Sequence, residues 1–389
     1  MSDSAPSRLL RDSRLYLVFS ITLMGVMGVS SITPAFPEIA EHFGLSSREV
    51  GLLLTVFTVP GIVLAPLMGF LADRFGRKTV LVPALLLFGM AGAALALAPG
   101  FPVLLLLRLF QGAGAASLTS LSVTLLGDIY DGETRERAVG YNASTLSIGT
   151  AAFPLLGGAL AGISWRLPFL LPVAAIPIAI LVLARFEVPD VSHGAAQGRL
   201  RAVIRNARQE GIVTLSILAI LVFILLYGAY LAYMPFLLRE RFQASPALIG
   251  AIMSTMSLAT AVVASRRGAI SRRLSIRPTL VIAFLCYALA LAAIPLIPLL
   301  WLLPAATLLY GVAQGLTIPT IQSQIAGRAP MELRGATVAA NAMAIRIGQT
   351  IGPLLAGAIF AGLGIQGVFW LAATVPALMI AVLLFSRRL

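Results

Sequence analysis

The sequence is poor in the residues that build catalytic and metal sites. Its 389 residues include one cysteine, two histidines and only 15 acids, and charged residues of either sign make up 11% of the chain. A single cysteine, Cys286, excludes an internal disulfide framework and a cysteine-ligated metal cluster. His42 and His193 lie far apart, and no constellation of nucleophile, base and acid surrounds them. The sequence therefore predicts no metal site, no cofactor and no enzymatic activity.

Acidic residues are also outnumbered, by 28 lysines and arginines, which gives a net charge of +13. In a soluble chain that balance would suggest a nucleic-acid partner. However, 59% of the residues are apolar and the mean hydropathy is +0.97. No soluble fold buries that much apolar surface, so the composition predicts an integral protein of the lipid bilayer that binds no nucleic acid.

Long apolar runs predict an all-α membrane fold. A helix needs about 20 apolar residues to cross a bilayer core of about 30 Å, and the chain contains twelve such stretches separated by short charged or Gly/Pro-rich joints. Ser46 and Glu49 have the spacing of a capping box, which predicts a helix start there. The predicted helices span residues 15–37, 47–71, 79–98, 101–129, 136–162, 165–185, 211–238, 246–265, 278–297, 299–327, 335–362 and 365–386.

Basic residues in the joints predict the orientation. When alternate joints are placed on opposite sides of the membrane, 22 lysines and arginines fall on the side of the two termini and 4 on the other side. Lysine and arginine accumulate in cytoplasmic loops. We therefore expect a multi-pass protein of the cytoplasmic (inner) membrane with both termini in the cytoplasm. The remaining two basic residues, Arg108 and Arg346, fall inside predicted helices.

An internal repeat divides the chain. A shift of 199 residues aligns the two halves without gaps and pairs residues 149–158 (GTAAFPLLGG) with residues 348–357 (GQTIGPLLAG). The repeat predicts two pseudo-symmetric six-helix bundles, at 1–185 and 211–389, joined by a cytoplasmic linker at 186–210. Secondary transporters have this architecture, with the substrate site between the halves. Other paired positions are Gly51 with Gly250, Gly112 with Gly311, and Asn142 with Asn341.

The joint between the second and third predicted helices, residues 69–78, reads GFLADRFGRK. Gly69 allows two helices to approach closely, Gly76 permits a sharp turn, and Asp73 is an acid surrounded by cations at a helix end. A plain positively charged loop would account for the cations alone. The whole string, however, resembles the G-x-L-a-D-r-x-G-r-k signature of the major facilitator superfamily.

Two further segments carry the same resemblance. Residues 108–114 (RLFQGAG) resemble the helix-four signature of that family, and residues 149–158 resemble its helix-five signature. The resemblance covers the whole chain and is to the branch of twelve-helix drug:proton antiporters. The sequence departs from this pattern at two positions. Phe153 replaces the glycine expected before the helix-five proline. In the second copy of the loop motif, Arg272 occupies the position that corresponds to Asp73.

The resemblance implies a cytoplasmic gate at this joint. We expect Asp73 to form charge-assisted contacts with nearby arginines or helix ends. The end of helix four is expected to take part through Asp128, which lies within reach of Arg135 and Arg137. The predicted gating and coupling residues are Gly69, Asp73, Arg74, Gly76, Arg77, Asp128 and Arg135.

The two arginines inside helices are candidates for substrate binding. An arginine at the centre of a membrane helix costs about 2.5–3.5 kcal/mol on insertion scales, so each should face a cavity or a partner. Arg108 lies about two turns from the outer end of helix four, and Arg346 lies near the middle of helix eleven. The alternative is structural: Arg108 would snorkel outward or bond to backbone carbonyls, and Arg346 would brace neighbouring helices.

The resemblance also places helices one, four, seven and ten around a central cavity. Tyr227, Tyr230 and Tyr233 recur at a spacing of three, which predicts that they share one side of helix seven. Aromatic and amide side chains suit an amphipathic organic ligand. Ordinary helix packing is the alternative and, for Tyr233, an interfacial aromatic belt. The predicted substrate-binding residues are Arg108, Gln111, Tyr227, Tyr230, Tyr310, Gln314 and Arg346.

Acids are absent from the middle of every predicted helix. A proton-coupled mechanism then needs an acid at a helix end, and Asp128 is our first choice, followed by Asp73 and Glu38. The sequence predicts a monomeric secondary transporter that exports small amphipathic organic molecules in exchange for protons. A carrier of anionic metabolites or lipids and a non-transporting membrane sensor remain as alternatives.

Overall fold

The computed structural model describes residues 9–185, 211–330 and 333–385, without the side chains of Arg185 and Arg334. The predicted linker at 186–210 lies outside these residues, so the domain boundaries stay a prediction.

The N-terminal half is a run of helices that crosses the membrane six times. The first, fourth and sixth crossings each consist of two or more helical pieces, whereas the second, third and fifth are single helices. The elements are α2 (Ser13–Ser30), η1 (Thr33–Ala35), α3 (Phe36–Phe43), α4 (Ser47–Phe75), α5 (Arg77–Leu95), α6 (Phe101–Ala115), α7 (Leu118–Ile129), α8 (Gly132–Ala161), η2 (Leu167–Ala174) and α9 (Ala175–Arg185).

The C-terminal half repeats this order and contains one unusual element, the π-helix η3, within its first crossing. The elements are α11 (Ile212–Ile224), η3 (Leu225–Tyr233), α12 (Met234–Phe242), α13 (Pro246–Ser265), α14 (Arg267–Ser271), α15 (Ile276–Ala293), η4 (Ile294–Leu296), η5 (Leu300–Leu302), α16 (Leu303–Arg328) and α17 (Arg334–Phe385).

The last helix accounts for two predicted crossings. Eleven segments of the described chain are long and apolar enough to span a membrane, and the last of them, Gly335–Phe385, has 51 residues. Gly364 breaks it with a φ of 66° and a ψ of −172°, a conformation that favours glycine. The two parts, 334–363 and 365–385, are each long enough to cross the membrane. The twelve-helix fold predicted from the sequence is therefore confirmed.

Local sequence signals explain where helices begin and how closely they pack. The predicted capping box is present: Glu49 N donates to Ser46 Oγ at 3.3 Å, and Ser46 N donates to Glu49 Oε2 at 2.9 Å. Gly158 lies where an added Cβ would stand 2.3 Å from the carbonyl oxygen of Pro246. Gly250 of α13 meets the carbonyl oxygen of Pro154 in the same way, at 2.1 Å. Only glycine permits this crossing of α8 and α13.

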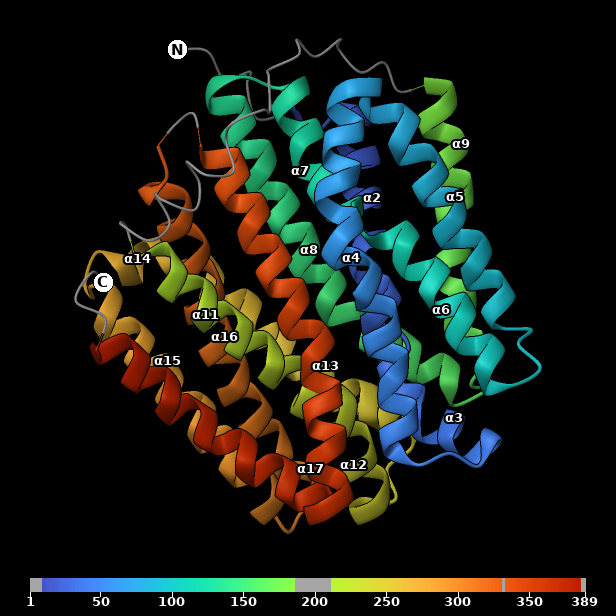
Figure 1. Cartoon of the computed structure of the whole chain (residues 1–389), viewed down its shortest axis with the longest axis vertical. Coiled ribbons are helices and arrows are strands. Elements are labelled where there is room, and N and C mark those ends of the chain that lie inside the picture. Colours follow the sequence, from blue (N-terminus) through green and yellow to red (C-terminus); the bar gives the residue numbers. More distant parts are fainter. Residues whose placement is uncertain (1–8, 186–210, 331–332, 386–389) are drawn as a thin grey trace.

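The two halves are joined toward one side of the molecule. We call the side on which the described residues begin, at Leu9, and end, at Phe385, the terminal side, and the opposite side the far side. On the far side α8 meets α13 through the glycines above. Thr350 of α17 contacts α4 as well, with 2.9 Å between its Oγ1 and Thr58 Oγ1. In Figure 1, α4 and the orange first part of α17 run closest in the lower part of the view and separate toward the top.

Candidate functional site

Arg108 is completely buried in α6, and its guanidinium lies against two other helices. Nη1 donates to the carbonyl oxygen of Gly28 at 2.9 Å, and Nε donates to that of Leu53 at 3.3 Å. In a continuing helix the amide of Ile32 would donate to the Gly28 carbonyl. Because α2 ends at Ser30, this amide donates to the Val29 carbonyl, and the Gly28 carbonyl is free to accept from Arg108. A cation at this position also lies at the negative end of the helix dipole of α2.

The Arg108 charge is only partly compensated. Its guanidinium carbon lies 4.3 Å from the ring centroid of Phe57, and Nη1 also donates to Gln111 Oε1 at 2.5 Å. In the described part of the chain no carboxylate pairs with it, and both Arg108 Nη2 and Gln111 Nε2 are buried without a hydrogen-bond partner. Two donors of one cluster are thus unsatisfied in this conformation.

Arg346 lies between the two halves. It is partly buried in α17, and its Nη1 donates to Gln349 Oε1 at 3.0 Å. A Cβ added to Gly61, in α4 of the opposite half, would stand 3.0 Å from Arg346 Nε, so the glycine makes room for the guanidinium. The side chain is therefore at the boundary across which the halves must move.

Tyr227 lies in η3, is 8% exposed, and is within electrostatic range of both Arg108 and Arg346. The structure thus brings together three predicted binding residues from α6, η3 and α17, with Gln111 attached to one of them. We call Arg108, Gln111, Tyr227 and Arg346 the central basic site.

The other predicted binding residues form a separate cluster inside the C-terminal half. The rings of Tyr230 and Tyr310 stack with centroids 4.9 Å apart, and Tyr287 packs edge-on against Tyr310 at 4.8 Å. Tyr287 also donates a hydrogen bond to Gln314. Tyr230 and Tyr310 are fully buried and Gln314 is 7% exposed. Because Tyr287 belongs to α15, this tyrosine cluster ties α15 to α16 and η3.

The π-helix explains why the three tyrosines of helix seven do not share one side. Its i→i+5 hydrogen bonds widen the turn, so residues three apart point in more divergent directions than in an α-helix. Tyr227 approaches the arginines, Tyr230 donates to the carbonyl oxygen of Met253 at 3.2 Å, and the ring of Tyr233 lies 5.3 Å from that of Phe360. The prediction of a shared face is wrong for this reason.

The gating motif forms an ion network around Arg77, which is 6% exposed. Its Nη1 donates to Asp73, and its Nε donates to Asp128 Oδ2 at 3.0 Å. This network joins the end of α4, the start of α5 and the end of α7, all within the N-terminal half. Gly76, with a φ of 90°, makes the turn between α4 and α5.

Other predictions for this region need correction. Asp128 pairs with Arg77, whereas Arg137 pairs with Glu133 at 2.6 Å. The guanidinium of Arg135 lies over Gly127, where an added Cβ would stand 2.9 Å from its Nη2. Arg74 lies over the Phe75 ring at 5.5 Å. No atom lies within 4 Å of a Cβ built on Gly69, so that glycine permits no close helix approach in this conformation.

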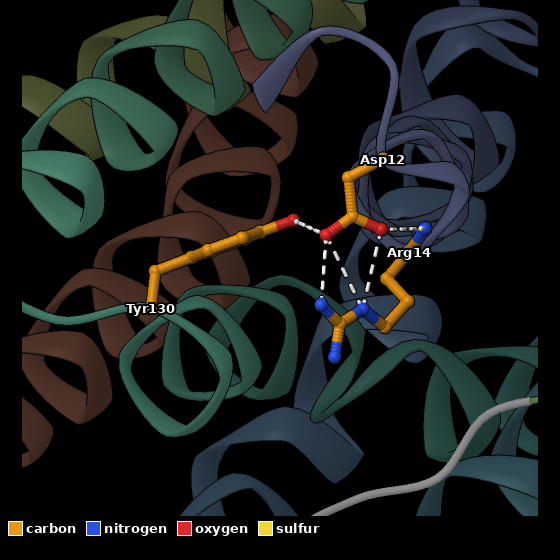
Figure 2. Close-up of polar contacts among 3 residues, drawn as sticks. All are labelled: Asp12, Arg14 and Tyr130. Carbon is orange, nitrogen blue, oxygen red and sulfur yellow. Dashed lines mark hydrogen bonds and ion pairs between the residues drawn. The ribbon is translucent and has the colours of Figure 1, made fainter. Parts of the chain in front are cut away.

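A second polar cluster on the terminal side escaped the sequence reasoning (Figure 2). Asp12 caps α2, accepts from Arg14 Nη2 at 3.0 Å, and accepts from the hydroxyl of Tyr130, just after α7, at 2.8 Å. Burial by itself raises the pKa of Asp12, but the hydrogen bonds from Arg14 and Tyr130 outweigh burial and lower it. Burial and the bond to Asp12 raise the pKa of Tyr130. Asp12 is therefore held charged, which makes it a poor proton acceptor.

On the far side an arginine of one half meets two acids of the other. Arg239 of α12 lies 3.8 Å from Glu38 Oε1 and 3.4 Å from Glu41 Oε2, both in α3. Glu38 Oε2 is buried and has no hydrogen-bond partner. The sequence singled out Glu38 but not its partner, which is 201 positions away in the chain.

Comparison with family models decides the classification. Residues 18–348 and, in a second overlapping match, residues 299–389 match the model described as Major Facilitator Superfamily. The chain belongs to the major facilitator superfamily. It is accordingly a multi-pass membrane protein of a family of transporters.

Curated relatives of this superfamily member include exporters and resistance proteins. It is 32% identical over 157 residues to the Bacillibactin exporter of Bacillus subtilis (strain 168), which covers 39% of each chain. It is 27% identical over 182 residues to the Quinolone resistance protein NorA of Staphylococcus aureus, covering 47% of this chain and 46% of NorA. Each match spans less than half the length of the relative.

Solved structures confirm the fold. The nucleoside transporter NupG aligns with a TM-score of 0.80 at 14% identity, covering 96% of this chain and all of the other. The human organic anion transporter MFSD10 aligns with a TM-score of 0.72 at 21% identity, covering 97% and 99%. At these identities the likeness establishes the twelve-helix major facilitator fold and nothing of the substrate.

Proposed function

We propose that this protein is a secondary transporter that exports small amphipathic organic molecules by alternating access. The observation that carries the proposal is the central basic site. Arg108 and Gln111 come from one half and Tyr227 and Arg346 from the other; Arg346 lies over Gly61 across the boundary, and Tyr227 is within electrostatic range of Arg108. A ligand held there touches both halves, so its binding is sensitive to their relative movement.

The chemistry of the site favours a ligand with an aromatic or apolar body and an acceptor group. Arg108 Nη2 and Gln111 Nε2 are donors without partners, and Phe57 supplies an aromatic face against the Arg108 guanidinium. The named activities of the relatives, export of bacillibactin and resistance to quinolones, favour efflux over uptake of anionic metabolites or lipids. We further propose that the protein works as a monomer and catalyses no covalent reaction.

The described conformation is the one closed toward the outside in this proposal. The positive-inside distribution assigns the terminal side to the cytoplasm of a cell whose inner membrane holds the protein. The contacts of α4 with α17, α8 with α13 and α3 with α12 then close the outer side. Export requires these contacts to break after the ligand has bound from the cytoplasm.

Protons are the proposed coupling ion, and Glu38 is the acid best placed to carry the coupling. Its partner Arg239 belongs to the other half, so opening of the far side must separate the pair. Asp128 differs, because its partner Arg77 belongs to the same half and stays with it during such a movement. The structure therefore supports moving Glu38 ahead of Asp128 among the candidates that the sequence offered.

Transport into proteoliposomes tests the proposed function. With an imposed pH gradient, we expect the purified protein to accumulate a quinolone, an aromatic molecule with a carboxylate, above the level in protein-free liposomes. A small hydrophilic anion such as citrate serves as the control and should not accumulate. Accumulation of citrate instead of the quinolone would favour an anionic-metabolite carrier, and transport of neither, with binding intact, would favour a sensor.

Cysteine labelling tests the proposed orientation. In a Cys286→Ser background, Leu97→Cys places a thiol on the far side at a position that is 82% exposed. Glu133→Cys places one on the terminal side, where the side chain is 76% exposed. A membrane-impermeant maleimide added to intact cells should label Leu97→Cys at once and Glu133→Cys only after permeabilisation. The reverse pattern would place the termini outside.

A further inference from the structure

A cavity of about 310 Å³ lies at the terminal-side end of the C-terminal half, among α13, α14, α15 and α16. None of the residues of the central basic site lines this cavity, so the two are separate. Its polar wall includes Arg267, Thr320 and Gln324, and its apolar wall includes Ile270, Leu274 and Leu316. It thus combines a cation, hydrogen-bonding groups and an apolar surface.

The internal repeat explains why space is left there. The shift of 199 residues relates Asp73 to Arg272, Arg77 to Ile276 and Asp128 to Gly327. In the N-terminal half those three residues form the ion network that fills the end of the bundle. In the C-terminal half none of the three ionic partners is retained, and Ile276 lines the cavity instead.

Among the described residues, the same replacements leave the positive charge around Arg267 without an acidic partner. Arg267 donates from Nη2 to Ser323, but its Nε is buried without a hydrogen-bond partner. Burial lowers the pKa of Arg267, and none of the described carboxylates lies within ion-pair distance of it. Among the described residues of the C-terminal half the only acid is Glu240, which lies in α12 toward the far side. Arg266 and Arg272 add exposed positive charge nearby.

We infer that this cavity binds a phosphate group, which supplies the negative charge that the lost aspartates supply in the other half. A phosphate offers several acceptor oxygens for an arginine and neighbouring hydroxyl and amide groups. The site lies between the end of the apolar segment at Ser265 and the start of the next at Ile276, which is the depth of the lipid headgroups. The apolar wall fits the first part of an acyl chain. Phospholipid headgroups and free phosphate share the recognised chemistry.

Melting curves of the purified full-length protein test the inference. The probes are a short-chain phosphatidylglycerol and inorganic phosphate, each titrated separately. The test variant is Arg267→Gln, and the matched control is Arg266→Gln, which removes the same charge from the exposed neighbour. We expect the lipid to stabilise the wild type and the control, and to bind Arg267→Gln about tenfold more weakly, the effect of losing one charge-assisted contact.

A second variant keeps the test decisive if Arg267→Gln fails to fold. Leu316→Trp fills the cavity without changing any charge and should weaken the stabilisation as well. Stabilisation by both probes, dependent on Arg267, supports a phosphate site open to free anions, and stabilisation by the lipid alone supports a headgroup site. The inference is overturned if neither probe stabilises the wild type, or if Arg266→Gln weakens binding as much as Arg267→Gln.

Discussion

Transport of anionic amphipathic compounds is expected to fall by about 10- to 100-fold when Arg346 is replaced by glutamine. A hydrogen bond to a charged group contributes about 1.5–3 kcal/mol, and each 1.4 kcal/mol is about tenfold in affinity. Arg346 is partly buried and donates to Gln349 within its own helix, so its replacement leaves the fold intact. Neutral compounds of similar size should lose much less affinity. Binding and transport of a matched anionic and neutral pair measure the difference.

Arg108→Gln should produce the same discrimination together with a loss of stability. Removal of its guanidinium leaves the buried carbonyl of Gly28 without a donor, which costs about 1–3 kcal/mol, and also removes the bond to Leu53. The melting temperature should therefore fall for Arg108→Gln but not for Arg346→Gln. Arg166→Gln, which removes an exposed arginine on the far side, is the charge-matched control. Equal losses for anionic and neutral compounds in both variants would show that the two arginines only brace the fold.

Glu38→Gln is expected to abolish accumulation driven by a pH gradient while exchange of substrate down its own gradient continues. In the described conformation Arg239 favours the charged carboxylate. When the far side opens, Arg239 departs with its half, and the loss of this cation makes the carboxylate easier to protonate. Return of Arg239 on closure favours the charged form again and drives the proton off. A glutamine side chain does not titrate, so the variant cannot take up a proton on opening and release it on closure.

Asp128→Asn serves as the contrasting variant in the same experiment. Its ion pair with Arg77 stays within one half, so we expect slower transport with pH-driven accumulation preserved. Glu41→Gln controls for loss of charge beside Arg239, because the Glu41 side chain is 75% exposed and can stay hydrated in both states. If Asp128→Asn uncouples transport and Glu38→Gln does not, Asp128 is the coupling acid. A wild type that ignores the pH gradient would exclude proton coupling altogether.

Sequence reasoning was sufficient for the architecture because each signal it used is local. A run of about 20 apolar residues must cross the bilayer wherever the rest of the chain lies, and the loop motif at 69–78 is a contiguous string. The family match and the twelve-helix fold confirmed these predictions. The division of the last helix was also a local signal, since Gly364, where the structure breaks the helix, lies between the predicted spans 335–362 and 365–386.

The partners of the polar side chains were decided only by the tertiary structure. Arg108 bonds to a carbonyl 80 residues away, and Thr55 bonds to one 295 residues away. No local pattern encodes such pairings, because they depend on how the helices tilt and cross. The spacing of Tyr227 and Tyr230 was visible in the sequence, but the π-helical turn that separates their directions was not. The sequence thus determined which residues are buried in the membrane, and the packing of the two halves decided which of them meet, since each contact needs helices from distant parts of the chain.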